Sequence, residues 1–75
     1  MTDYLSEQPH VKATVVEVLP AVGLAYLDGD DQRSWTVTRC TRGTGLSTLQ
    51  KGSRVALTVQ HYPEFSLVSE YSPLN

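Results

Sequence analysis

Short apolar runs, rich in β-branched and aromatic residues, recur along the chain at intervals of about ten residues, with glycine, proline and aspartate between them. The first run covers residues 10–19, holds four valines and stops at a proline, which cannot donate a ladder hydrogen bond. The next runs, 23–27 and 34–40, flank an Asp28-Gly29 pair that predicts a tight hairpin, because glycine accepts a positive φ. The rhythm predicts an all-β fold in which the second and third strands pair antiparallel.

The second half of the chain continues this pattern. Residues 53–61 alternate cleanly, with Val55, Leu57 and Val59 on the inward side. A turn at Tyr62-Pro63-Glu64 then leads into a fifth strand over 65–71, which is predicted to end before Pro73. Residues 41–52 are too irregular for a strand and are predicted to form a crossover loop with no more than one turn of helix. In the third strand, alternation places Trp35, Val37 and Arg39 on one side, and Trp35 and Val37 are expected in the core.

The length of 75 residues allows one domain, predicted over 10–75, preceded by a polar arm over 1–9 that is either loose or peripherally docked. The apolar stretches are far shorter than the roughly 20 residues that cross a bilayer, so we expect no membrane association. Eight acidic against six basic residues give a net charge of -2, so any nucleic-acid binding must be local. The lone Cys40 cannot form an internal disulfide and no export signal is visible, so we expect a cytoplasmic location.

The residue types that bind metals or carry out catalysis are scattered. Neither His10, His61 nor Cys40 has a ligand partner at a paired spacing, so we expect no metal site, no catalytic residues and no enzymatic activity. The aspartates at positions 28, 30 and 31 lack the later acidic residue of a calcium loop, and we interpret them as turn residues. The 42–45 segment, Arg-Gly-Thr-Gly, lacks the lysine and following helix of a nucleotide-binding loop, so no cofactor is expected.

The strand pattern predicts a small five-stranded antiparallel Greek-key barrel of the OB type, with an SH3-like barrel as the alternative. The segment 48–59, Thr-Leu-Gln-Lys-Gly-Ser-Arg-Val-Ala-Leu-Thr-Val, resembles the turn and fourth strand of the cold-shock domain. The spacing of Thr14-Val15 and of Gly23-Leu24-Ala25-Tyr26-Leu27 is similar to that family as well. The resemblance covers about residues 11–74 and implies a cold-shock-like barrel.

Cold-shock domains bind single-stranded RNA and DNA by stacking bases on exposed aromatics of strands one to three. By this resemblance, Glu17 stands where the family has an exposed tryptophan, and Val16 stands at the neighbouring lysine. Segment 22–26 replaces the family's Lys-Gly-Phe-Gly-Phe, which leaves Tyr26 as the surviving stacking ring. Segment 36–39 replaces Phe-Val-His-Phe with two threonines and one arginine, and Leu46 stands at an exposed phenylalanine.

Two hypotheses follow. In the first, the protein binds single-stranded RNA or DNA weakly and with a strong dependence on charge, on the face of strands one to three. Its candidate residues are Tyr26, Arg39, Leu24, Thr36, Thr38, Arg42 and Lys51. In the second, the barrel is a protein-interaction module that has lost nucleic-acid binding and presents an aliphatic patch. The candidate patch residues are Val16, Val18, Leu24 and Leu46. The sequence leaves the choice between RNA and DNA, the sequence preference and the oligomeric state open.

Overall fold

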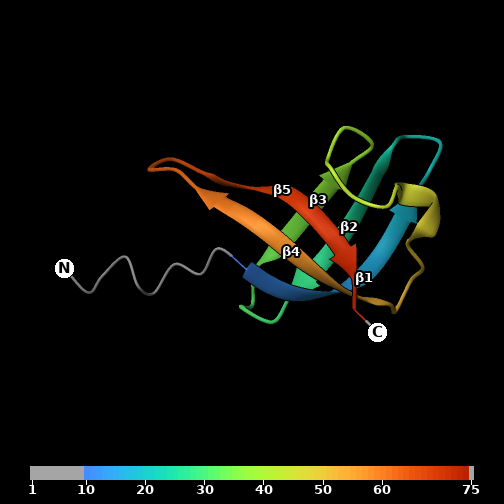
Figure 1. The fold of residues 1–75 in the computed structure, drawn as a ribbon, viewed down its shortest axis with the longest axis horizontal. Coiled ribbons are helices and arrows are strands. Elements are labelled where there is room, and N and C mark those ends of the chain that lie inside the picture. Colours follow the sequence, from blue (N-terminus) through green and yellow to red (C-terminus); the bar gives the residue numbers. More distant parts are fainter. Residues whose placement is uncertain (1–9, 75) are drawn as a thin grey trace.

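The computed structural model describes residues 10–74, and over this range the chain forms five antiparallel strands that curl into a half-barrel (Figure 1). The elements are β1 (His10–Leu19), β2 (Leu24–Gly29), β3 (Ser34–Thr38), the short 3-10 helix η2 (Leu46–Thr48), β4 (Arg54–His61) and β5 (Ser66–Pro73). Their order in the sheet is β3-β2-β1-β4-β5. A fourth strand that returns to lie beside the first is the Greek-key arrangement. The all-β prediction is confirmed, and the half-barrel is compatible with a small OB-like barrel; the predicted arm at 1–9 lies outside the described residues.

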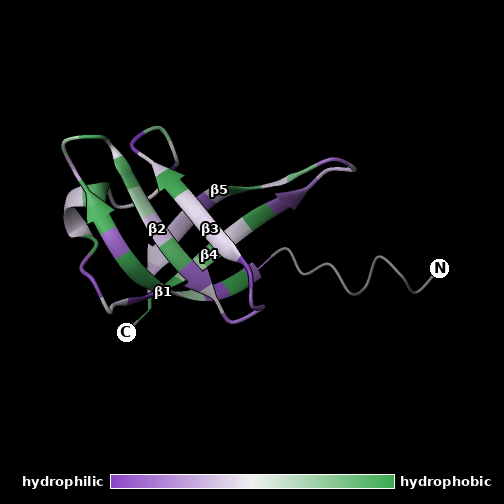
Figure 2. Cartoon of the chain, turned by 180° about the vertical axis from the view of Figure 1, so that it is seen from behind, coloured by the Kyte–Doolittle hydropathy of each residue, from purple (hydrophilic) through white to green (hydrophobic). Residues whose placement is uncertain are grey.

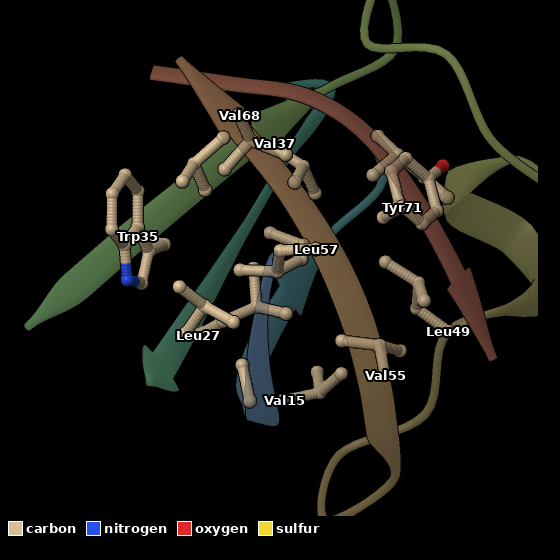
Figure 3. Close-up of a cluster of buried hydrophobic side chains, with 14 residues drawn as sticks. Val15, Leu27, Trp35, Val37, Leu49, Val55, Leu57, Val68 and Tyr71 are labelled. Carbon is tan, nitrogen blue, oxygen red and sulfur yellow. The ribbon is translucent and has the colours of Figure 1, made fainter. Parts of the chain in front are cut away.

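The core fills the concave side of the curled sheet (Figure 3). Alternation along each strand sends one side chain inward and the next outward, and hydropathy changes in bands along β1 and β2 for the same reason (Figure 2). The largest fully buried side chains are Leu27, Leu57, Val15, Val37 and Val55. Trp35 and Val59 are also buried, so the predicted inward faces of the third and fourth strands are confirmed. Within residues 10–74, no helix is long and apolar enough to cross a membrane.

The third strand ends two residues earlier than predicted. The Thr38 N–H donates to the Thr41 hydroxyl (3.0 Å) and the Thr41 N–H donates to the Thr38 carbonyl (3.0 Å), so the chain turns directly after Thr38. Arg39, which was predicted within the strand, therefore lies beyond it and is exposed. At the other end of the domain, β5 continues through Pro73, because a proline is tolerated on an edge strand.

The β2–β3 hairpin exists as predicted, but a different residue takes the left-handed conformation. Gly29 completes β2, and Gln32 has a φ of 66°. The Gln32 N–H donates to the Gly29 carbonyl (3.0 Å), and the Gly29 N–H donates to the Arg33 carbonyl (2.8 Å). This is a type I turn followed by a left-handed residue, the usual three-residue hairpin loop. The Asp31 carboxylate accepts from the Trp35 indole N–H (3.3 Å), which links the turn to the core.

The crossover loop is fixed to β5 by one tyrosine. The Tyr71 N–H donates to the Arg42 carbonyl (2.9 Å), and the Tyr71 hydroxyl accepts from the Gly45 N–H (3.0 Å). Between these bonds, Gly43 lies against the buried Tyr71 ring, so closely that a Cβ there would come 2.6 Å from two ring carbons. Arg42 and Glu70 form an isolated parallel bridge. These contacts close part of the seam between the edge strands β3 and β5.

Candidate functional site

The outer face of β1, β2 and β3 is arranged in rows of paired residues. The middle row is Glu17–Tyr26–Thr36, and the row beyond it is Leu19–Leu24–Thr38. Tyr26 is 42% exposed and belongs to β2, which lies between β1 and β3. Its neighbours across the strands are Glu17 and Thr36, which are shorter or more flexible side chains and leave Tyr26 exposed.

A β-bulge decides which β1 residue stands beside Tyr26. The register of the β1–β2 pair shifts between Val15 and Glu17, so Val15 pairs with Leu27 and Glu17 pairs with Tyr26. The bulge leaves Val16 and Glu17 both exposed, while Val15 points into the core. A carboxylate is therefore the direct neighbour of the exposed ring.

Two of the nearby cations are already engaged with carboxylates. The Lys51 Nζ lies 3.8 Å from Glu17 Oε1, and these side chains are 76% and 49% exposed, which makes the pair loose. Arg54 donates two hydrogen bonds to the Asp30 carboxylate (2.9 and 2.6 Å) and one to the Thr14 hydroxyl (2.8 Å). The hydrogen bond from Arg54 lowers the pKa of Asp30, and the same bond raises the pKa of Arg54. Arg54 therefore ties the β2–β3 hairpin to β1 and β4, whereas the exposed contact of Lys51 with Glu17 contributes little.

Arg39 lies over the β1–β2 turn, opposite Gly23 and one residue beyond the Leu24–Thr38 row. Its backbone N–H donates to the Gly23 carbonyl (3.2 Å), and its Nη2 lies 3.5 Å from the Val22 carbonyl. Gly23, with a φ of 84°, makes room for the guanidinium, since a Cβ there would come 2.6 Å from Arg39 Nε. Arg39 is thus level with Gly23, three residues along β2 from Tyr26, a separation of about 10 Å along a strand. It belongs to the rim of the face and not to its centre.

The structure brings most of the predicted nucleic-acid-binding residues together. Leu24, Tyr26, Thr36 and Thr38 share the outer face, with Arg39 and Lys51 at its rim. Arg42 lies elsewhere, at the seam between β3 and β5.

The predicted aliphatic patch needs two corrections. Leu46 is buried, because η2 turns it into the core, and Val18 is only partly exposed and packs against the core. Val16 is exposed and Leu24, like Val18, is half-buried, so Leu46 is the one member of the patch that does not reach the surface.

Sequence reasoning missed an aromatic cluster at the β4–β5 turn. The rings of Tyr62 and Phe65 are stacked, with centroids 4.8 Å apart and planes 26° apart, and they are 45% and 56% exposed. The Tyr62 hydroxyl donates to Gln60 (2.8 Å), and Leu67, which pairs with Gln60, is also exposed. We call Tyr62, Phe65 and Leu67 the hairpin cluster. The sequence signal for this cluster is the Tyr-Pro-Glu-Phe segment, in which two aromatic residues flank a tight turn. The part of the sequence after Arg54 also contains no lysine or arginine.

Among residues 10–74, no group of three or more His, Cys, Asp or Glu side chains is placed to hold a metal ion. The exposed groups of the outer face are one aromatic ring, hydroxyls, a carboxylate and cations, which suit a planar, hydrogen-bonding ligand. Neither a scan of protein-family models nor a search of curated protein sequences gives a match to this chain.

Proposed function

We propose that the protein binds single-stranded nucleic acid weakly on the outer face of β1–β3. The observation that carries this proposal is the exposed Tyr26 ring in the middle row of that face. Bases stack on exposed aromatic rings regardless of sequence, with about 1–3 kcal/mol per stacked base. One ring supports one stacked base, so the affinity is low and depends on the polar and charged side chains around Tyr26.

The surroundings of Tyr26 supply polar and ionic contacts at the rim. Lys51 lies beside Glu17 at the β1 end of the middle row, and Arg39 lies beyond the Leu24–Thr38 row. Both side chains are exposed, so both can reach phosphates. Neutralising two phosphates of a single strand predicts a slope of about -1.4 for log K against log salt. Thr36 is paired with Tyr26 on the β3 side, and its hydroxyl can both donate and accept.

The test is a binding titration with a fluorescent single-stranded oligothymidine, followed by anisotropy at two salt concentrations. The Tyr26→Ala variant is expected to lose about tenfold or more in affinity, the equivalent of one stacked base. Tyr62→Ala is the matched control, because Tyr62 is equally exposed but lies in the hairpin cluster. Equal affinity of Tyr26→Ala and the parent protein, or an equal loss in the control, would contradict the proposed site.

A second candidate function is protein–protein interaction through the hairpin cluster. Its support is an exposed stacked pair of aromatic rings on a hairpin that carries Glu64 and no lysine or arginine. Aromatic residues are enriched at protein interfaces, and the missing cations make this surface unsuited to a phosphate backbone. Sedimentation of the parent protein and of Phe65→Ser at increasing concentrations measures self-association and tests this second function. Self-association that disappears in the variant, without binding of oligothymidine, would favour this second function.

A further inference from the structure

Glu17 is placed to contact a base that stacks on Tyr26. The two residues are directly paired across β1 and β2, and both point outward. Side chains that oppose each other in an antiparallel pair start from Cβ atoms about 4.5–5.5 Å apart. A base lying on the ring therefore brings one of its edges toward the glutamate carboxylate.

The carboxylate accepts hydrogen bonds and cannot donate them when ionised. Only Oε1 lies near Lys51, at 3.8 Å, and both side chains are largely exposed, so the carboxylate retains unused acceptor positions. On the opposite side of Tyr26, the Thr36 hydroxyl both donates and accepts, so it accommodates any base edge. Selectivity at this position therefore comes from Glu17.

The four bases present different edges to such an acceptor. Guanine carries two adjacent donors, the N1–H and the N2 amino group, which match the two oxygens of one carboxylate. Adenine and cytosine place a ring-nitrogen acceptor next to their amino group. Thymine and uracil flank a single N3–H with two carbonyl oxygens, which a carboxylate repels.

We infer that Glu17 makes the base position on Tyr26 selective for guanine. This inference rests on the proposed single-stranded nucleic-acid binding and adds the base preference of the same site. It also assigns Glu17 a cost for the other bases, because the carboxylate repels the ring nitrogen or carbonyl oxygens that their edges present, and it repels the nearby phosphates.

The test uses four DNA heptamers that differ only at the central base: TTTGTTT, TTTITTT with inosine, TTTATTT and TTTTTTT. The guanine heptamer is expected to bind about tenfold more tightly than the all-thymine heptamer, as one bidentate contact allows. Inosine lacks the N2 amino group and is expected to fall between the two. Glu17→Gln is expected to remove the guanine preference and to raise the affinity for the all-thymine heptamer. Glu64→Gln, at an exposed carboxylate in the β4–β5 turn, is the matched control and is expected to change neither.

The outcomes separate this inference from the function on which it rests. Equal binding of all four heptamers, or a guanine preference that survives in Glu17→Gln, would overturn the role of Glu17 and leave the nucleic-acid function standing. Binding of none of the heptamers at low salt would overturn the proposed function, and the base preference with it.

Discussion

Replacing Gly43 with alanine is expected to destabilise the fold by forcing the crossover loop away from β5. The new Cβ would lie 2.6 Å from two carbons of the Tyr71 ring. That ring is 2% exposed and is fixed at its hydroxyl by the Gly45 N–H, so it has little room to move. Gly43 does not have a positive φ, so the substitution introduces the contact without backbone strain.

The magnitude follows from two opposing effects. Forcing an extra methyl group into a packed site costs about 1–3 kcal/mol. Glycine to alanine at a permitted φ stabilises by about 0.4–1 kcal/mol, because it restricts the unfolded chain. The expected net loss is about 1–2 kcal/mol. In a domain of this size, each kcal/mol corresponds to about 4–8 °C in the melting temperature.

The assay is urea denaturation followed by circular dichroism, with Tyr71 variants completing a double-mutant cycle. Tyr71→Phe by itself is expected to cost about 1 kcal/mol of stability, because it loses the hydrogen bond from the Gly45 N–H. It keeps the ring, so Gly43→Ala is expected to destabilise the Tyr71→Phe protein as much as it destabilises the parent. Tyr71→Val removes the ring, and in that background Gly43→Ala is expected to be neutral or stabilising. A Gly43→Ala protein as stable as the parent, or an unchanged cost in the Tyr71→Val background, would refute this account of the seam.

Three further substitutions test other parts of the structure. Gln32→Gly is expected to raise the free energy of unfolding by about 0.5–1 kcal/mol in urea denaturation, because Gln32 has a φ of 66°; an unchanged midpoint would argue against this turn. Asp30→Asn is expected to lower stability near neutral pH. The hydrogen bond from Arg54 keeps the pKa of Asp30 in the folded protein below 3.8, so the pair stabilises above that pH and its contribution is lost as the pH falls through the folded pKa. The urea midpoints of the parent and variant should converge in acid, and a constant gap would contradict the linkage. Gly23→Ala is expected to lower the free energy of unfolding by about 1–2 kcal/mol because of its φ of 84°, and by a further amount because the new Cβ would clash with the Arg39 side chain. Adding Arg39→Ala should restore only the stability lost to the clash. Full restoration would argue against backbone strain at Gly23.

The sequence was a good guide wherever alternation decides the structure. Val55, Leu57 and Val59 are buried as predicted, because a period of two with β-branched residues has one satisfactory arrangement on a half-covered sheet. The predicted end of the third strand was wrong, because the hydrogen bonds of Thr38 and Thr41 end β3 before Arg39. Local threonine bonding of this kind competes with the ladder and leaves no trace in hydropathy.

The candidate site was only partly predictable for related reasons. The exposure of Tyr26 follows from its alternation with Ala25 and Leu27, which are both buried. Leu46 was assigned to the surface from the resemblance, but η2 directs it into the core, and a leucine gains more from burial there. The hairpin cluster depends on a local contact of the Tyr62 and Phe65 rings across the β4–β5 turn, which alternation within the strands does not encode.

The most direct test of the central claim is an amide-shift titration of the isotope-labelled protein with the guanine heptamer at low salt. The predicted result is a set of shifts on the outer face of β1–β3, centred on Tyr26 and including Glu17 and Thr36, that weakens as salt is added. No shifts at all, or shifts confined to Tyr62 and Phe65, would contradict the claim that this face binds single-stranded nucleic acid.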